Sequence, residues 1–408
     1  MFSHPLIRAL KSFQGNARAC VFTEPMWGIP YNLYAPYISV YMLAFGLKDS
    51  QIGLITSVGL TFQIFAALMS GIITDKMGRK RTTLIYDFLS WSIPTLIWAV
   101  AQDFTYFLVA AIVNSVWRIT SNSWTCLMVE DTDEEQLVDI YTWVYISGLL
   151  SAFFAPLAGL LVQTYSLVPT MRGLYLFACV MMTAKFLVLN IYVKETRQGV
   201  IRMRETQGQP VLALLKEYRG VIGAILKAPR TLFTLGIMLV LGASQSINGA
   251  FWSILVTTRL DIPEAHLAIF AFSRSVIMLV FFFAVMPAIR EMRFRNPMLV
   301  GFAGLALAQV ILISMPPGSY FLLLVNTLLE ACSVATLGTQ TDRMAVVTVD
   351  PNERARIQGL LYMIVILFTS PFGWIAGSLS EINRSFPFIL NITLFAVGAV
   401  LVYLASKK

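Results

Sequence analysis

The chain has 408 residues, of which 57% are hydrophobic and only 13% are charged. Soluble domains contain about 45–50% apolar and about 25% charged residues, so this composition excludes an ordinary water-soluble protein. The formal net charge of +8 would also suit a nucleic-acid-binding protein, but the positions of the basic residues lead to a different explanation.

Long apolar segments separated by short polar breaks fill the chain, and a helix that crosses about 30 Å of hydrocarbon needs roughly 20 such residues. The apolar runs are continuous, not alternating, which favours transmembrane helices over a β-barrel. The predicted fold class is therefore an all-α membrane protein with twelve transmembrane helices. We expect the spans at residues 19–46, 51–74, 83–101, 104–129, 139–165, 171–193, 231–257, 264–289, 297–315, 319–343, 357–380 and 387–405.

The basic residues gather on one side of this predicted topology. An even number of spans places both termini on the same side, and the loops of that side hold 23 of the 30 lysines and arginines. The positive-inside rule then puts both termini in the cytoplasm. We predict a multi-pass protein of the cell (cytoplasmic) membrane. Its predicted partner is the lipid bilayer, and we expect no binding to nucleic acid.

Residues 194–230 form the one long connection and divide the chain into two predicted six-helix bundles, residues 1–193 and 231–408. The apolar spacing over 211–226 is typical of an amphipathic helix at the membrane surface, and a simple tether is the alternative. In each half a charged turn precedes a span that contains a proline, Pro156 or Pro371. This repetition indicates internal duplication, which many transporters use to build two pseudo-symmetric bundles.

The segment GIITDKMGRKRTT (71–83) ends an uncharged run with Gly71, Asp75, Gly78, Arg79 and two further bases. It resembles the G-x-x-x-D-x-x-G-R-K/R loop signature of the major facilitator superfamily, and it lies where that family has it, after the second span. The resemblance extends over essentially the whole chain through the six-plus-six layout. It implies the major facilitator fold and transport of a small molecule by alternating access.

We interpret Gly71, Asp75, Gly78 and Arg79 as a gate element. A charge cluster at this loop can latch the cytoplasmic ends of the two bundles in one state and release them in another. The two glycines permit a close helix approach and a tight turn. The alternative is a positive-inside anchor without any gating role.

Four spans carry polar or aromatic side chains at spacings of three and four residues, which places these side chains on one helical face. In the family that the chain resembles, the four equivalent helices line the central cavity. We therefore predict a substrate site formed by Tyr31, Asn32, Tyr34, Asn114, Arg118, Ser121, Gln245, Asn248, Trp252, Asn326 and Glu330.

Three ionisable residues inside the spans are candidates for proton coupling: Glu330, Arg118 and Glu24. Arg118 matches the arginine of the R-x-x-Q-G pattern of the drug-antiporter branch, but Ser121 and Asn122 replace its glutamine and glycine. An arginine in the membrane stays charged and needs an anion, either a carboxylate or an anionic substrate.

Structural roles are the alternatives for the buried charges. Arg274 could form a structural ion pair with Glu330, and Glu24 could be a helix-end carboxylate at the cytoplasmic interface. We interpret Lys185 as a lysine that extends to the cytoplasmic headgroups.

The leading prediction is a secondary active transporter that exports amphiphilic drugs or organic metabolites in a proton-coupled manner. A proton-coupled or facilitated importer of a nutrient or organic anion is the alternative, favoured if Arg118 binds the substrate. No nucleotide loop, metal-ligand cluster or nucleophile with a histidine supports an enzyme. We expect a monomer whose partners are a small-molecule substrate and protons, without a cofactor or metal.

Overall fold

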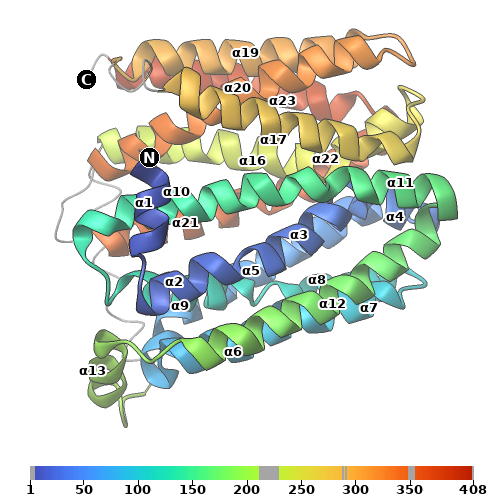
Figure 1. The fold of residues 1–408 in the computed structure, drawn as a ribbon. Coiled ribbons are helices and arrows are strands. Elements are labelled where there is room, and N and C mark those ends of the chain that lie inside the picture. The colour runs from blue at the N-terminus through green and yellow to red at the C-terminus, as the bar shows by residue number, and fades with distance from the viewer. Residues whose placement is uncertain (1–4, 211–228, 287–288, 290–291, 348–353, 407–408) are drawn as a thin grey trace. The chain divides into compact units, whose positions relative to one another are not determined.

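The computed structural model describes residues 5–210, 229–286, 289, 292–347 and 354–406, and the regular elements within these ranges are all helices (Figure 1). The amphipathic segment predicted at 211–226 lies outside the described residues. Contacts divide the chain into two compact units, which we call unit 1 (Met1–Ile38 and Phe62–Leu214) and unit 2 (Ser39–Thr61 and Leu215–Lys408). The division into six-helix bundles at residues 193 and 231 stays a prediction.

The all-α membrane fold is confirmed. Nine helices among the described residues are long and apolar enough to cross a membrane. The predicted spans 19–46, 83–101 and 104–129 are not among those nine, and in the structure each consists of consecutive shorter helices. The described helices fit twelve spans, and the number itself stays a prediction.

The second part of α5 (Asp49–Met77) belongs to unit 1, together with most of the shorter helices. The other helices of this unit are α1 (Pro5–Ser12), α2 (Gly15–Thr23), α3 (Pro25–Tyr34), α6 (Arg79–Asp87), α7 (Ile93–Ala99), α8 (Phe104–Asn114), α9 (Trp117–Val129), α10 (Glu134–Ser151), α11 (Ala155–Tyr165), α12 (Leu167–Tyr192) and α13 (Arg197–Glu205). Helix α12 packs against α3 and α7, and α6 packs against α9.

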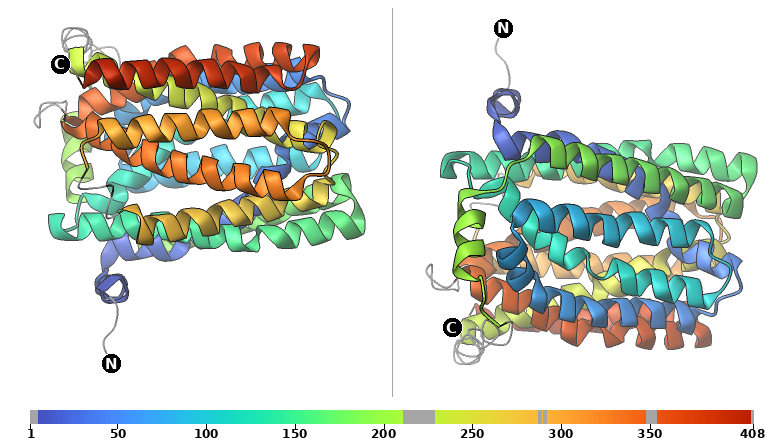
Figure 2. Two further views of the ribbon diagram at one scale, coloured as in Figure 1. Left: turned by 90° about the horizontal axis from the view of Figure 1, so that it is seen from above. Right: turned by 90° about the horizontal axis from the view of Figure 1, so that it is seen from below.

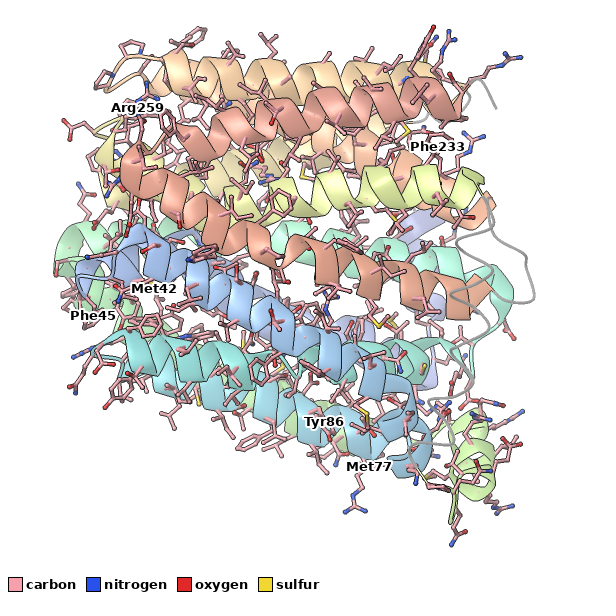
Figure 3. All side chains as sticks on the ribbon, turned by 180° about the vertical axis from the view of Figure 1, so that it is seen from behind. Met42, Phe45, Met77, Tyr86, Phe233 and Arg259 are labelled. Atoms are coloured by element: carbon pink, nitrogen blue, oxygen red, sulfur yellow. The ribbon has the colours of Figure 1, made fainter. Side chains whose placement is uncertain are left out.

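Unit 2 combines the first part of α5 with the helices of the second half of the sequence. These helices are α4 (Ile38–Ala44), α16 (Pro229–Thr258), α17 (Leu267–Ala284), α19 (Arg295–Ser314), α20 (Tyr320–Val347), α21 (Arg354–Thr369), α22 (Pro371–Ile382) and α23 (Phe386–Ala405). Helix α19 packs along α20 and α23, as the orange and red ribbons of Figure 2 show. In Figure 3, Phe233 marks the first part of α16, and Arg259 directly follows its last residue.

Two prolines set helix boundaries where the sequence predicts interrupted spans. Pro156 stands in the first turn of α11, directly after the 3-10 turn Ala152–Phe154. Pro371 begins α22, and one residue, Ser370, separates it from Thr369, the last residue of α21. A proline has no N–H to donate, so it fits the first turn of a helix and interrupts the hydrogen bonding of a longer one.

Apolar side chains cover much of the outer surface of the helices. Ile191 and Tyr192 at the end of α12 are 74% and 70% exposed, and Phe321 of α20 is 74% exposed. A soluble protein rarely presents contiguous apolar surface of this kind, whereas a bilayer provides an apolar solvent for it. The exposed surface and the apolar helices therefore identify an integral membrane protein.

Within unit 2 the first part of α5 lies very close to α22. A Cβ atom on Gly373 would lie 2.8 Å from the carbonyl oxygen of Gly53, and one on Gly377 would lie 2.6 Å from that of Asp49. Polar contacts reinforce this approach: Ser380 Oγ donates to Asp49 Oδ2 at 2.6 Å, and the Trp374 backbone N–H donates to Ser57 Oγ at 2.8 Å. Small residues permit close helix approach in membranes because they remove side-chain bulk.

We expect Gly53→Ala to destabilise unit 2, because the added methyl group would clash with the carbonyl group of Gly373. The measurement is the apparent Tm of the purified protein in detergent. Gly249→Ala is the matched control, since Gly249 also lies in a helix of unit 2 but an added Cβ there meets nothing within 4 Å. A Tm for Gly53→Ala equal to that of the control would contradict the close packing described here.

Candidate functional site

Residues of unit 1 line an open cavity of about 490 Å³. Pockets for small ligands typically span about 300–1,000 Å³ and combine apolar walls with a few polar groups. Five tryptophans and two tyrosines line this cavity. Its polar lining comes from Asn114, Thr120 and Ser121, and its charged lining from Glu24, Asp87 and Lys185.

A π-helical turn shapes one wall of the cavity. Residues Phe88–Ser92 form this turn between α6 and α7, and it places Trp91 in the cavity lining. The side-chain amide of Asn114 donates to the carbonyl oxygen of Ser90 at 2.7 Å, so a residue of α8 stabilises the turn. Single π-helical turns inside α-helices occur frequently at functional sites.

Three aromatic rings from two elements form a corner of the cavity. Trp27 and Tyr31 of α3 stack with ring centroids 4.8 Å apart. Trp91 stands edge-on to both, at centroid distances of 5.0 Å from Trp27 and 6.0 Å from Tyr31. Stacked and edge-to-face pairs each contribute about 0.5–1.5 kcal/mol beyond their area burial, so this corner is a rigid surface.

The charged groups of the cavity come from three different helices. Lys185 of α12 forms an ion pair with Glu24 at 3.2 Å and lies over the Trp124 ring, 5.5 Å from its centroid. Asp87, the last residue of α6, accepts a hydrogen bond from Thr120 Oγ1 at 2.8 Å. Lys185 does not extend to the membrane surface as we expected, because it is 95% buried and paired with Glu24.

The sequence reasoning above does not select Asp87 or a site role for Lys185. An acid inside the predicted span 83–101 is costly in hydrocarbon, and this signal alone could have indicated Asp87. The pairing of Lys185 with Glu24 joins helices that are far apart in the sequence, so helical spacing within one span could not reveal it.

Five of the predicted site residues line this cavity: Glu24, Tyr31, Tyr34, Asn114 and Ser121. The other two predicted residues of unit 1 have different contacts. Asn32 donates to the carbonyl oxygen of Gly28 at 2.8 Å within its own helix.

Arg118 is not part of the cavity lining. Its Nε donates to Gln63 Oε1 at 3.0 Å, and its guanidinium carbon lies 4.1 Å from the centroid of the Trp117 ring. Because Trp117 does line the cavity, Arg118 contacts the cavity wall through this ring.

The predicted site residues of unit 2 lie on α16 and α20. On α16, Asn248 accepts from the Asn391 side chain at 3.0 Å, Trp252 meets Phe270 edge-on at 6.1 Å, and Gln245 is exposed. On α20, the side chain of Asn326 donates to the carbonyl oxygen of Ala308 at 2.6 Å.

Glu330 is a buried carboxylate of unit 2. It is 8% exposed and lies 3.5 Å from Arg274 of α17. The structure thus brings together the two residues that the sequence offered as a structural ion pair, and it leaves a coupling role of Glu330 as a prediction.

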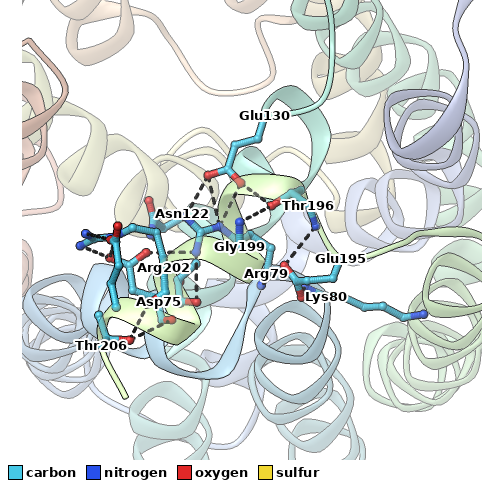
Figure 4. A network of polar contacts seen from close by, with 12 residues as sticks. Asp75, Arg79, Lys80, Asn122, Glu130, Glu195, Thr196, Gly199, Arg202 and Thr206 are labelled. Carbon is cyan, nitrogen blue, oxygen red and sulfur yellow. Dashed lines mark hydrogen bonds and ion pairs between the residues drawn. The ribbon is translucent and has the colours of Figure 1, made fainter. Parts of the chain in front are cut away.

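The predicted gate residues lie in a polar network at the junction of α5 and α6 (Figure 4). Arg79 forms ion pairs with Asp75 and with Glu130 of the α9 end, each at 3.0 Å. Gly78 between the two helices has φ 82°, a left-handed conformation that favours glycine. Gly71 lies within α5, one turn before Asp75.

Helix α13 docks onto this network from the predicted linker. Arg202 donates to Asp75 Oδ2 from two nitrogens, at 2.8 and 3.0 Å, and this hydrogen bonding raises the pKa of Arg202. The Glu195 carboxylate accepts from the backbone N–H groups of Arg79 and Lys80, at 2.8 and 3.0 Å. A carboxylate on the first N–H groups of α6 complements the helix dipole, typically by about 0.3–1 kcal/mol.

Comparisons with known proteins agree with this architecture. The family model of the Major Facilitator Superfamily matches residues 27–361. The chain therefore belongs to the Major Facilitator Superfamily and is an integral membrane transporter of the secondary type. Among curated proteins it is similar to an uncharacterized MFS-type transporter, YqjV of Bacillus subtilis (strain 168), with 25% identity over 127 residues. That match spans 31% of this chain and 31% of the relative.

Two solved structures share the fold over nearly the full length. A mutant of the nucleoside transporter NupG has a TM-score of 0.77 and 15% identity, covering 96% of this chain and 100% of its own. A POT family transporter in complex with a thioalcohol-conjugated peptide has a TM-score of 0.70 and 14% identity, covering 98% and 99%. At such low identity the likeness shows the fold alone.

We expect Asp75→Asn to loosen the attachment of α13, because the neutral amide loses the charge of both its pairs, with Arg79 and with Arg202. The measurement is the rate of limited trypsin cleavage at Arg202 and Arg204, which should rise several-fold. Glu205→Gln is the control, since it removes only the exposed pair of Arg202 within α13. Equal cleavage rates for the two variants would show that Asp75 does not hold α13.

Proposed function

We propose that this transporter exports amphiphilic drugs or organic metabolites across the cell membrane in exchange for protons. One observation carries the proposal: the cavity of unit 1 combines an aromatic wall with the carboxylate of Glu24, whose side chain is 14% exposed. The aromatic rings suit the apolar part of an amphiphilic molecule, and the carboxylate provides a group that can gain or lose a proton. Both termini would lie in the cytoplasm, as the distribution of basic residues predicts.

Proton coupling is proposed through Glu24, with Glu330 as the corresponding carboxylate of unit 2. Glu330 is buried and the side chain of Glu24 is 14% exposed. Each has a cation within ion-pair distance, Lys185 at 3.2 Å from Glu24 and Arg274 at 3.5 Å from Glu330. A buried carboxylate that loses its cation is far more stable in its neutral, protonated form. A change in these pairs is therefore linked to proton uptake or release. In this proposal Arg118 contributes to proton coupling indirectly, through its contact with the Trp117 ring of the cavity wall.

We expect Glu24→Gln to abolish transport driven by a proton gradient, because the amide cannot release a proton. In proteoliposomes with an imposed pH gradient, substrate accumulation should fall at least tenfold for a panel of amphiphilic dyes and organic metabolites. Exchange of labelled for unlabelled substrate without a gradient should persist, since it requires no net proton movement.

Glu264→Gln is the control for this experiment, because Glu264 lies in a 3-10 turn outside the aromatic cavity. Gradient-driven transport that survives Glu24→Gln at the level of the control would contradict coupling through Glu24. The direction of movement under the same gradient separates the proposed exporter from the alternative, an importer of a nutrient or organic anion.

The network around Asp75 is proposed as a gate that stabilises one state of the transport cycle. We expect Asp75→Asn to slow turnover at least several-fold while the protein still elutes as a folded species in gel filtration. The measurement is the initial rate of counterflow at saturating substrate. A normal rate in a variant whose α13 has become sensitive to trypsin would show that the network anchors α13 without gating transport.

A further inference from the structure

We propose that the unit 1 cavity selects organic cations and that Asp87 is the group that recognises their positive charge. The inference rests on the proposed function in using the same cavity as the transport site. It goes further by naming the charge class of the substrate and a recognition residue on α6.

The cavity lining carries one negative charge more than it can neutralise by itself. Its charged side chains are two carboxylates, Glu24 and Asp87, and one ammonium group, Lys185. The ammonium group forms its ion pair with Glu24 at 3.2 Å, and it acts on Asp87 electrostatically without an ion pair to it. Asp87 is left as the carboxylate without an ion-pair partner within the cavity lining.

The contacts of Asp87 leave one of its oxygens unoccupied. Asp87 is 95% buried, and its Oδ1 accepts the hydrogen bond from Thr120. Its Oδ2 has no hydrogen-bond partner among the described residues. Removing a carboxylate from water is costly unless a cation or several donors replace the lost hydration. The unoccupied oxygen therefore marks the position where a positively charged group would be stabilised.

The aromatic corner adds a second element that favours cations. Ring faces of tryptophan and tyrosine attract positive charge within about 6 Å of the ring centroid, and this attraction strengthens when water is excluded. Trp27, Tyr31 and Trp91 present such rings to the cavity. The protein already uses this interaction for its own ammonium group, because Lys185 lies over Trp124.

An anionic substrate fits the same lining poorly. It would have to draw Lys185 away from Glu24, and both carboxylates of the lining would then be without an ion-pair partner. The guanidinium group of Arg118 offers no help, since its contacts are with Gln63 and Trp117 and it does not line the cavity.

Two probes of nearly the same size and shape but opposite charge test the inference, tetraphenylphosphonium and tetraphenylborate. Each is titrated separately into the purified full-length protein by isothermal titration calorimetry, in sodium buffer because potassium tetraphenylborate precipitates. We expect the cation to bind at least tenfold more tightly than the anion. Equal affinities, or tighter binding of the anion, would overturn the proposal even if no variant could be purified.

Substitutions then assign the selectivity to Asp87. Asp87→Asn should lower the affinity for tetraphenylphosphonium at least tenfold and change that for tetraphenylborate much less. Asp87→Glu, which restores the charge, should recover most of the cation binding. Asp139→Asn is the control, because Asp139 lies on α10 outside the cavity lining. Cation affinity that is the same in Asp87→Asn and in the control would overturn the role of Asp87.

The binding measurement separates this inference from the proposed function. Selective cation binding that depends on Asp87, in a protein that shows no proton-driven transport, would support the inference and reject the proton coupling. Proton-driven transport together with equal affinities for the cationic and the anionic probe would support the proposed function and reject the inference.

Discussion

The structure of unit 1 depends on the burial of two carboxylates and one ammonium group in a single aromatic cavity. Breaking a buried ion pair by removing one partner typically costs about 3–5 kcal/mol, because the remaining charge is left without compensation. The pair between Lys185 and Glu24 therefore fixes α12 against the beginning of α3. Thr120 in turn ties Asp87 to α9. Four segments of the chain thus meet around three charges.

The irregular backbone of unit 1 serves this arrangement. A continuous α-helix from Arg79 to Ala99 would rotate Trp91 away from its present position, since the π-helical turn adds one residue to the regular repeat. The carbonyl group of Ser90 that the turn exposes is bonded by Asn114. The break between α8 and α9 follows directly after Asn114. Two of the discontinuous spans, 83–101 and 104–129, are therefore interrupted next to side chains that line the cavity, Trp91 and Asn114.

Sequence periodicity could predict the spans, the membrane setting and the aromatic face of the first span, because these follow from the spacing of residues along one helix. Tyr31 and Tyr34 were found in this way and do line the cavity. Periodicity could not predict the pairing of Lys185 with Glu24, which depends on how helices distant in sequence pack. It also predicts Arg118 as a site residue, and that role stays a prediction: in the structure Arg118 contacts Trp117, which lines the unit 1 cavity.

The linker shows the same limit of prediction from sequence periodicity. Helix α13 is short and rich in charge, RQGVIRMRE, with three large apolar side chains among its nine residues, so apolar periodicity alone gives it a weak signal. Its position depends on charges supplied by other elements, above all Asp75, which binds Arg202. The segment 211–226, where apolar spacing predicted a helix, lies outside the described residues.

Helix α6 connects the two charged regions of unit 1. It begins at Arg79, which binds Asp75 and Glu130, and it ends at Asp87 in the cavity. Eight residues of α-helix span roughly 12 Å, so the two sites are separated by about two turns of one short rod. A helix this short does not bend easily, and a displacement of Arg79 must move Asp87 with it. Helix α6 therefore couples the family's loop signature directly to the carboxylate of the cavity. No other residues are needed to transmit the movement.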